Sequence, residues 1–378
     1  MISGADEMKK VVGIYLHIPF CLQKCLYCDF NSYSGILGRQ GEYTAALCRE
    51  ISGFEDGYQA DSIYFGGGTP TLLHTENIAD IMDAVRKKFV LCSDCEITME
   101  CNPGTADKKR MEDLRRLGIN RLSIGMQSSA DRELKKLGRI HCMDETIQCV
   151  RDARSAGFSN LSLDLMYGLP DQSIAAWEET LEAAAELAPE HLSCYALKVE
   201  EGTPFAKMQL NLPEDDIVRE MYDLAFEKLE DAGYLRYEIS NFAKPGKESR
   251  HNLKYWKCDD FIGFGAGAYS CIHGRRFANV SEISRYIQHC ADEERFIYQE
   301  KLNRDAQMSE FMFLGLRTEK GADLEEFEKR FDVKAEMVFA GPLKKYRQSG
   351  LICQEEKRVF LRKDMFFVSN LILADFLL

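Results

Sequence analysis

The stretch Tyr15-Leu-His-Ile-Pro-Phe-Cys21-Leu-Gln-Lys-Cys25-Leu-Tyr-Cys28 decides the fold and the chemistry of this chain. It overlaps an apolar run, residues 11–16, that predicts a buried strand. Thiolates at the spacing C-x3-C-x2-C are soft ligands that select iron–sulfur clusters, zinc or Cu(I). Three cysteines on one loop can hold a cubane cluster, and without a fourth cysteine in step one iron keeps an open position. The pattern predicts a [4Fe–4S] cluster on Cys21, Cys25 and Cys28.

A zinc loop or unrelated core cysteines are the alternatives to a cluster. Zinc needs a fourth ligand, whereas His17 lies too close within the strand and no His or Cys follows Cys28 before Cys48. The spacing therefore favours the cluster over zinc.

Composition limits the class of protein. With 378 residues, 45% of them apolar, the chain is long enough for two or three domains with buried cores. A net charge of −13 argues against a nucleic-acid surface. Met1 to Lys10 lack the apolar core of a signal peptide, and no apolar run is long enough to cross a membrane. Fourteen cysteines are best interpreted as reduced thiols plus one cluster in a cytoplasmic protein.

Six short apolar runs, each followed by an amphipathic stretch, predict alternating strands and helices. The predicted strands are residues 11–16, 62–65, 96–100, 121–125, 161–166 and 192–197. The predicted helices are residues 42–51, 75–88, 108–117, 144–156, 174–187 and 215–232. This alternation indicates an α/β fold with parallel strands and right-handed crossovers. We expect a partial (β/α)6 barrel, with a doubly wound open sheet as the alternative.

Beyond residue 232 the pattern changes. Residues 233–274 are rich in glycine, aromatic and polar residues and show no clean periodicity. Helices are predicted at residues 308–316, 324–331 and 335–348, followed by a β-hairpin at 351–361. This order predicts a small α+β, winged-helix-like domain, and its acidic stretch 319–328 argues against DNA binding. The predicted division is therefore a barrel at 1–232, an accessory segment at 233–300 and a C-terminal cap at 301–378.

Polar residues follow the predicted strands at the edge where α/β barrels place their chemistry. The three cysteines follow the first strand, and Gly66-Gly67-Gly68-Thr69-Pro70 follows the second. Glu100, Gln127 and Asp164 end or lie within the next three. Consecutive glycines allow a ligand to approach the backbone closely, although a plain strand-to-helix turn is the alternative. A buried carboxylate such as Glu100 needs a partner.

The cysteine spacing, with the aromatic Tyr27 before the last cysteine, resembles the signature of the radical S-adenosylmethionine (SAM) superfamily. The resemblance implies a partial barrel and a [4Fe–4S] cluster whose free iron chelates the amino and carboxylate groups of SAM. It implies that Gly67, Gly68 and Thr69 hold the methionyl amino group. The other residues implied to bind SAM are Tyr15, Tyr27, Glu100, Gln127, Arg139 and Asp164.

Individual roles are implied by this resemblance, matched residue by residue. Glu100 could accept from the ribose hydroxyls or the amino group, while Gln127 and Asp164 could share the remaining polar edges of the nucleoside. Arg139 could pair with the methionyl carboxylate through its guanidinium fork, with a surface ion pair as the alternative. Tyr15 could reach the adenosyl end, with core packing as the alternative.

Other candidates are declined. Cys92 and Cys95 form a C-x2-C, with Cys101 beyond it, but no second pair follows at zinc-ribbon spacing, so these thiols are expected to be incidental. Three isolated histidines are expected to be solvent-facing or structural: His74, His141 and His191.

Within the superfamily, the motifs at residues 15–21, 65–70, 100–103 and 164–170 are similar to those of the oxygen-independent coproporphyrinogen III oxidase-like family. The oxidase has a further cysteine where this chain has Phe30, and a longer segment before its first strand. Both differences favour the haem chaperone branch, HemW. That branch is also indicated by His251-Asn252-Leu-Lys-Tyr255-Trp256, a motif associated there with haem.

The chemistry of this motif suits haem. An imidazole such as that of His251 is a common axial ligand to haem iron, and Tyr255 and Trp256 could stack on a macrocycle. The alternative is that His251 and Asn252 form a hydrogen-bonded structural corner. The following segment, Gly263-Phe-Gly-Ala-Gly-Ala-Tyr269-Ser, is expected to approach its neighbours closely.

Three functions follow from the resemblance. The first is a haem chaperone that binds a [4Fe–4S] cluster, SAM and haem and passes haem to an acceptor such as an apo-cytochrome. The second is a coproporphyrinogen III oxidase that cleaves SAM reductively, disfavoured by Phe30 and the short N-terminus. The third is a regulatory protein with a vestigial site, disfavoured by the intact polar residues. We expect a monomer or homodimer that binds no nucleic acid.

Overall fold

The computed structural model describes residues 10–378, so the expectation that Met1 to Lys10 hold no signal peptide falls almost wholly outside the described residues. These residues form two compact units that alternate along the chain. The first unit contains the described residues up to Gly125, with Gly138–Ser159 and Asp260–Glu300. The second contains Met126–Leu137, Asn160–Asp259 and Lys301–Leu378. The division into three consecutive segments stays a prediction.

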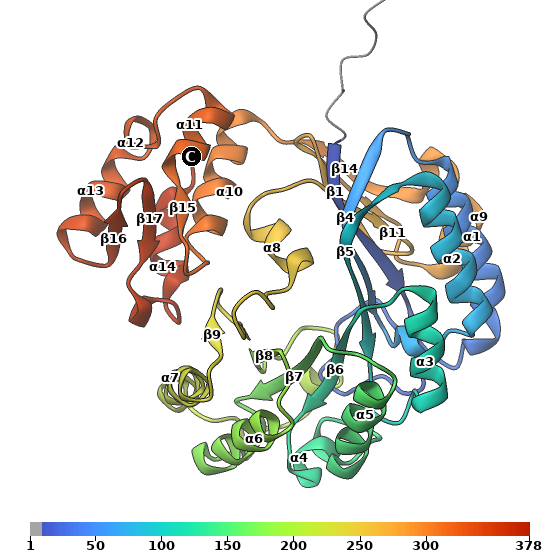
Figure 1. Ribbon diagram of the computed structural model, residues 1–378. Helices are drawn as coiled ribbons and strands as arrows, with labels where there is room; N and C mark the ends of the chain where they lie inside the picture. Colours follow the sequence, from blue (N-terminus) through green and yellow to red (C-terminus); the bar gives the residue numbers. More distant parts are fainter. Residues whose placement is uncertain (1–9) are drawn as a thin grey trace, which may run out of the picture. The chain divides into compact units, whose positions relative to one another are not determined.

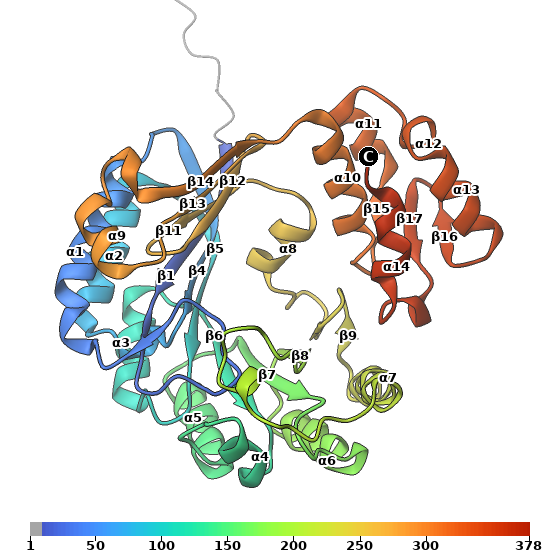
Figure 2. The ribbon, with the colours of Figure 1, turned by 180° about the vertical axis from the view of Figure 1, so that it is seen from behind.

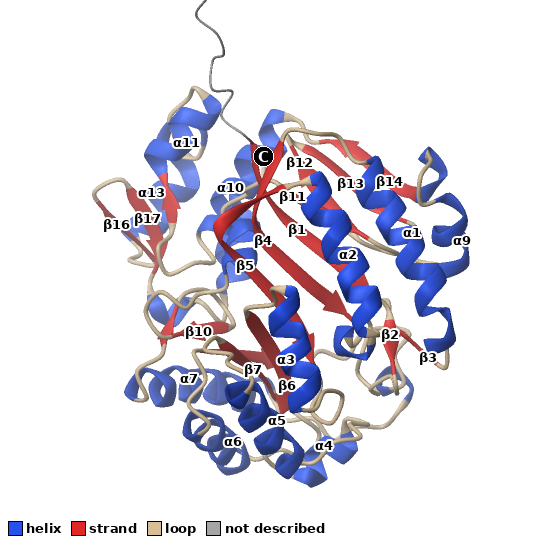
Figure 3. Ribbon diagram, turned by 45° about the vertical axis from the view of Figure 1, so that its right-hand side comes forward, coloured by secondary structure: helices blue, strands red, loops and turns tan. Residues whose placement is uncertain are grey.

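The first unit is built on parallel strands whose residues are largely buried on both faces (Figures 1 and 3). Strand β1 pairs in parallel with β4, β4 with β5, and β5 with β6. The elements of this part are β1 (Lys10–Ile18), β2 (Phe20–Cys21), β3 (Tyr33–Ser34), α1 (Gln40–Gly53), β4 (Tyr58–Gly67), α2 (Thr75–Lys88), β5 (Val90–Cys101), α3 (Lys108–Leu117), β6 (Arg121–Gln127) and α5 (Met143–Ser155). Helices α1, α2 and α3 lie on one face of these strands (Figure 3).

The sheet of the first unit continues through a part of the sequence in which no regular element was predicted. Its remaining elements are β11 (Phe261–Phe264), β12 (Tyr269–Ile272), β13 (Arg275–Asn279), α9 (Ile283–His289) and β14 (Phe296–Lys301). Strand β11 pairs in parallel with β1, and β12 and β13 follow antiparallel. These strands have four to six residues each, so they carry too little periodicity to be recognised.

A buried carboxylate joins this extension to α1. Glu50 accepts hydrogen bonds from the backbone N–H of Gly265 (2.9 Å), the amide of Asn279 (2.6 Å) and the hydroxyl of Tyr286 (2.6 Å). Burial raises the pKa of Glu50 to about 7, against the opposing effect of these donors. Gly265 has a φ of +106°, and a Cβ there would lie 2.7 Å from the Tyr43 hydroxyl, so the expected close approach is confirmed.

The second unit has its own short sheet and helices. Strand β7 pairs in parallel with β8, and β8, β10 and β9 continue antiparallel. Its elements before the C-terminal part are α4 (Asp131–Lys136), β7 (Leu161–Tyr167), α6 (Ile174–Glu186), β8 (His191–Ala196), α7 (Asp215–Asp231), β9 (Leu235–Arg236), β10 (Asn241–Ala243) and α8 (Arg250–Trp256). All six predicted strands and the six helices that follow them are therefore present, with ends shifted by a few residues.

The C-terminal part of the second unit is a small α+β domain, best seen in Figure 2. It contains α10 (Arg304–Gly315), β15 (Ala322–Asp323), α11 (Leu324–Phe331), α12 (Ala335–Val338), α13 (Ala340–Gln348), β16 (Ile352–Glu355), β17 (Arg358–Leu361) and α14 (Ser369–Leu373). The predicted hairpin is β16–β17, and β15 adds a third antiparallel strand.

One predicted element of this domain is wrong. The helix expected at residues 335–348 is broken into α12 and α13 at Phe339, whose backbone leaves the helical region (φ −107°, ψ 32°). Pro342 cannot donate a backbone hydrogen bond and would clash with a preceding turn, so it is tolerated only near the start of a helix. Phe339 is buried against the rings of Phe327 and Phe376, which fixes the break.

A buried arginine joins this domain to the rest of the second unit. Arg236 of β9 donates to Glu319 (2.7 Å) and to the hydroxyl of Tyr222 (3.0 Å), and its guanidinium lies 4.0 Å from the ring centroid of Phe366. Since Glu319 and Phe366 belong to the C-terminal part, one guanidinium ties the two parts of the unit together.

Membrane-spanning helices are absent from residues 10–378: none of the helices there is both long enough and apolar enough to cross a bilayer.

Replacing Glu50 by Gln should lower stability and flatten its pH dependence. The folded state holds the proton of Glu50 up to a pKa of about 7, against 4.5 for an ordinary glutamate. The contribution of this group to stability is therefore present below pH 4.5 and is lost as the pH rises through 7. The glutamine amide also carries an N–H2 group, which must face one of the donors that bond to Glu50. This mismatch should lower the free energy of unfolding by about 1–3 kcal/mol. Thermal midpoints between about pH 5 and 8 test this, and a variant with the wild-type pH profile would contradict it.

Candidate functional site

The three cysteines lie on the loop that leaves β1. Cys21 is buried at the end of β2, while Cys25 and Cys28 are half-buried and joined by a turn in which the N–H of Cys28 donates to the carbonyl of Cys25 (3.2 Å). Burial raises the pKa of the thiols of Cys21 and Cys28. Metal binding at these thiols would therefore release protons.

No three His, Cys, Asp or Glu side chains among residues 10–378 converge on a point where a single metal ion would fit. In a [4Fe–4S] cluster each cysteine binds a different iron at the corners of a cube. A loop that binds such a cluster holds its three sulfurs apart, at different corners of the cube. The lack of a convergent set of ligands among the described residues therefore concerns sites for a single metal ion, such as zinc, and not a cluster site.

The glycine segment after β4 packs directly against the start of the cysteine loop. Gly68 donates to the carbonyl of Ile18 (2.8 Å) and Thr69 to that of Phe20 (2.7 Å). A Cβ on Gly68 would lie 2.6 Å from the oxygen of Phe20, and one on Gly67 would lie 2.5 Å from the ring of His17. Gly67 also has a φ of +113°, which favours glycine. The chain requires glycine at both positions.

His17 fixes the far end of the cysteine loop. Its Nε2 lies 2.8 Å from the carbonyl oxygen of Asn31, which can only accept, so Nε2 carries the proton. Nδ1 then accepts from the hydroxyl of Tyr15 at 3.1 Å. Burial lowers the pKa of His17 to about 4, so the imidazole is neutral at about pH 7. Tyr15 is therefore held in place through His17 and is not simply packed in the core.

Glu100, at the end of β5, faces the glycine segment. Its Oε2 accepts from the backbone N–H of Gly67 (3.0 Å) and its Oε1 from the hydroxyl of Tyr64 (3.0 Å). The ring of Tyr64 stacks on that of Tyr15, with 6.2 Å between centroids. Because the amides of Gly67, Gly68 and Thr69 all donate within the protein, a ligand at this segment would meet backbone or carboxylate oxygens instead.

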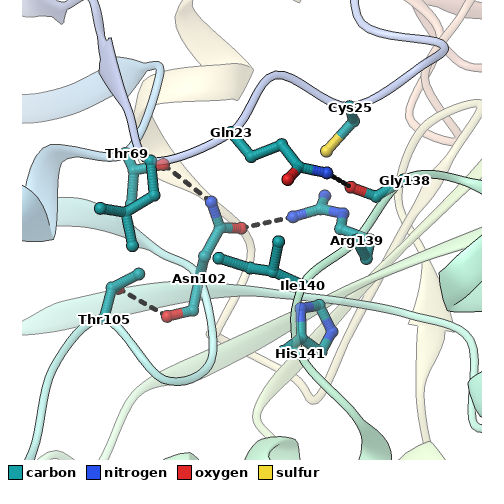
Figure 4. A pocket seen from close by; sticks show the side chains of 10 residues that line it. Gln23, Cys25, Thr69, Asn102, Thr105, Gly138, Arg139, Ile140 and His141 are labelled. Atoms are coloured by element: carbon teal, nitrogen blue, oxygen red, sulfur yellow. Dashed lines mark hydrogen bonds between the residues drawn. The ribbon is translucent and has the colours of Figure 1, made fainter. Parts of the chain in front are cut away.

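Arg139 lies beside the cysteine loop (Figure 4). It donates to the side-chain oxygen of Asn102 (2.6 Å) and to the hydroxyl of Tyr27 (2.8 Å). Burial alone would lower the pKa of Arg139, but the neighbouring Tyr27 and Cys25 raise it above its usual value; burial raises the pKa of Tyr27 to about 12. Its Nε is buried and finds no partner among the described residues. The alternative of a surface ion pair is therefore wrong, because the partners of Arg139 are an amide and a hydroxyl.

A pocket opens beside Cys25 and Arg139 (Figure 4). Its lining comprises Leu22, Gln23, Cys25, Thr69, Asn102, Thr105, Gly138, Arg139, Ile140 and His141. The segment at Gly138 lies against the cysteine loop, because Gln23 donates to the carbonyl of Gly138 at 2.9 Å.

Two predicted SAM residues lie in the second unit. Gln127 is buried at the end of β6 with a φ of +65°, a conformation that is uncommon outside glycine. Asp164 is half-buried in β7. Their roles toward SAM stay predictions.

The candidate haem residues lie on α8 of the second unit. Ser249 caps the helix by accepting from the N–H of Asn252, and Arg330 of α11 donates to the carbonyls of Lys257 and Cys258 just beyond its end. His251 is 1% exposed, and its Nε2 lies 2.9 Å from the hydroxyl of Tyr255. Asn252 and Trp256 are half-buried. For His251 the arrangement matches the structural-corner alternative.

Sequence reasoning missed several residues around the pocket. Asn102 and Thr105 join it through hydrogen bonds, and His141 is buried in its lining, although it was expected to be isolated. Asn102 directly follows Glu100 and Cys101, which is the one signal that could have found it. His191 is buried and structural, bonded to Ser162 (2.8 Å) and Tyr237 (2.8 Å).

The declined cysteines form no disulfide, nor do the other cysteines among residues 10–378. Cys92 is half-buried and Cys95 is buried. The thiol of Cys101 contacts that of Cys149, with 3.9 Å between the sulfurs.

Comparisons with known proteins agree with this geometry. The model of the radical SAM superfamily matches residues 15–184, and that of the HemN C-terminal domain matches residues 302–363. The chain is 38% identical to the haem chaperone HemW of Bacillus subtilis, over 96% of this chain and 98% of the relative. It is 42% identical to HemW of Escherichia coli, over 68% of this chain and 69% of the relative.

The solved coproporphyrinogen III oxidase HemN of Escherichia coli, a radical SAM enzyme, superimposes with a TM-score of 0.86 at 25% identity, over 97% of this chain and 90% of that one. The predicted α/β fold of the radical SAM type, with a C-terminal domain, is confirmed. The chain therefore belongs to the radical SAM superfamily and, within it, to the family of the haem chaperone HemW.

Proposed function

We propose that this protein is a haem chaperone that carries a [4Fe–4S] cluster, binds SAM beside it and delivers haem to an acceptor protein. Its similarity to curated haem chaperones over nearly the whole chain supports the haem function. The observation that carries the cofactor site is the half-buried Arg139 next to the three-cysteine loop, because its buried Nε lacks a partner among the described residues.

The residues present fit both cofactors. Cys21, Cys25 and Cys28 would hold three irons, and the donor set is the one that iron–sulfur clusters prefer. Arg139 offers an unused N–H donor to a carboxylate, the group that a guanidinium binds best. Such a cluster, held by the three cysteines, would supply reducing electrons beside the SAM site.

The remaining side chains would hold SAM in position. The carboxylate of Glu100 and the glycine segment around Gly67, Gly68 and Thr69 present oxygens that suit an ammonium group or ribose hydroxyls. Tyr27 orients Arg139, and Tyr15 lines the same side through its stacking on Tyr64. Gln127 and Asp164 are proposed to contact the nucleoside.

Haem is proposed to bind at α8. Trp256 and Asn252 are half-buried and can reach a ligand, whereas His251 and Tyr255 bond each other and support the helix. The acceptor is proposed to be an apo-cytochrome or another haem protein, and the chain a monomer or homodimer. The free thiols suit a reducing, cytoplasmic location.

An oxidase acting on coproporphyrinogen III is the second candidate, favoured by the match to HemN. Phe30 argues against it, because a 61% exposed phenyl ring stands where the oxidase has another cysteine. Reductive cleavage of SAM without porphyrinogen decarboxylation stays compatible with the proposal.

Replacing any one of Cys21, Cys25 or Cys28 by Ala should abolish the cluster, because two thiolates cannot hold a cubane whose fourth iron is already open. The measurement is iron content and visible absorbance after anaerobic reconstitution. Cys92→Ala is the matched control, since Cys92 is also half-buried and free. Wild-type iron content in a loop variant would exclude that ligand set.

Arg139→Lys should weaken SAM binding by roughly tenfold or more, because a lysine keeps the charge but loses the fork that reaches Asn102, Tyr27 and the ligand together. Equilibrium dialysis of SAM against reconstituted protein measures this. Lys135→Ala, at an exposed position, controls for loss of positive charge. Equal affinity in Arg139→Lys and the wild type would remove Arg139 from the site.

Haem titration of variants on α8 tests the proposed division of roles. Trp256→Ala should reduce haem affinity, whereas His251→Ala should lower the thermal midpoint and leave the Soret maximum of the bound haem where it is in the wild type. The imidazole is 1% exposed and already bonded to Tyr255, so it is poorly placed to reach iron. A displaced Soret maximum in His251→Ala would instead identify it as an axial ligand.

A further inference from the structure

A chain of three hydrogen bonds runs from Arg139 to Cys21, and Figure 4 shows the part of it from Arg139 through Asn102 to Thr69. Arg139 Nη1 donates to Asn102 Oδ1 (2.6 Å), Asn102 Nδ2 donates to Thr69 Oγ1 (2.8 Å), and Thr69 Oγ1 donates to Cys21 Sγ (3.7 Å). All four residues belong to the first unit. Asn102 is the link that joins the proposed carboxylate-binding arginine to the proposed iron ligand.

The direction of every bond in this chain is fixed by the first one. A guanidinium can only donate, so the oxygen of the Asn102 amide must face Arg139 and its nitrogen must face Thr69. The hydroxyl oxygen of Thr69 therefore accepts from Asn102, and its own proton is left to point at the sulfur of Cys21. Asn is suited to this position, because it presents an acceptor on one side and a donor on the other.

The geometry around Asn102 is held on its other sides. The hydroxyl of Thr105 donates to the backbone carbonyl of Asn102 at 2.6 Å and lies 2.7 Å from the hydroxyl of Thr71. Thr69 is 3% exposed, so water does not compete strongly for its hydroxyl. The side chains of Asn102 and Thr69 are therefore restricted to the orientation described above.

A hydrogen bond to a ligating sulfur stabilises negative charge there and is one of the factors that set the reduction potential of an iron–sulfur cluster. We infer that Asn102 is a positioning residue that couples the carboxylate site at Arg139 to the electron-donating strength of the cluster, through the hydroxyl of Thr69 on Cys21. This inference rests on the proposed function, since it needs a cluster on Cys21.

Asn102→Asp tests the coupling. Aspartate still accepts from Arg139 but also accepts from Thr69, so the hydroxyl proton turns away from the sulfur. We expect a more negative midpoint potential of the cluster than in the wild type, measured by redox titration of reconstituted protein followed by electron paramagnetic resonance without SAM. Thr69→Val should shift the potential in the same direction, and Thr69→Ser, which keeps the hydroxyl, should restore the wild-type value.

The double variant Asn102→Asp/Thr69→Val distinguishes an effect that is transmitted through Thr69 from a direct effect of the added aspartate charge on the cluster. If Asn102 acts through Thr69, the shift caused by Asn102→Asp must be smaller in the Thr69→Val background than in the wild type. Shifts that simply add, or a wild-type potential in Asn102→Asp, would overturn the inference. Should Asn102→Asp take up no cluster, Asn102→Ala replaces it: a smaller shift of the same sign is expected, and an unchanged potential overturns the inference.

Failure of the inference can be told apart from failure of the proposed function. Wild-type protein that takes up no cluster refutes both, whereas wild-type protein that loads normally, with variants of unchanged potential, refutes the coupling alone. Asn102→Ala should also raise the dissociation constant of SAM about fivefold or more, because the guanidinium loses the acceptor that orients it. Iron content and thermal midpoints of each variant confirm that the compared proteins are folded and loaded.

Discussion

The site depends on the close approach of the glycine segment to the strand and loop that carry the cysteines. Gly67 and Gly68 touch His17, Ile18 and Phe20 at distances that no side chain tolerates. This contact brings Thr69 to Cys21 and Glu100 to the backbone of Gly67. Any larger residue would separate two strands that are paired along their whole length, so the polar groups would no longer surround one pocket.

The cysteine loop is held at both ends by groups that do not titrate near neutral pH. His17 keeps one tautomer because its Nε2 proton is donated to the backbone carbonyl of Asn31. Its Nδ1 is therefore unprotonated and accepts a hydrogen bond from the hydroxyl of Tyr15. Asn31, at the exit of the loop, donates to the carbonyls of Ala266 and Ser281, both at 3.0 Å. The loop is thus ordered by the protein itself, which reduces the entropy lost when a ligand is bound.

Sequence patterns predicted the fold where strands are continuous apolar runs separated by long amphipathic helices, so that α2, α3 and α11 agree with their predicted bounds to the residue. Strands β9 to β13 have only two to five residues, too few to show a periodic pattern, so they could not be recognised. The site was predictable where its chemistry is concentrated in motifs, as for the cysteines and Glu100. Asn102 and His141 were not assigned to it, because an amide or an imidazole acquires its role from neighbours that are remote in sequence. For the same reason the partners of Arg139 and His251 could not be predicted.

Arg236 gives the C-terminal domain a role beyond its own fold. The guanidinium is surrounded by Tyr222, Phe226 and Phe366 and neutralised by Glu319, so two of its partners come from the part of the chain after residue 300. A shortened protein that ended before Glu319 would expose those rings to water and leave a positive charge without its counter-ion. The α/β part of the second unit and the C-terminal domain thus share one buried charge, so neither part has a complete interior without the other.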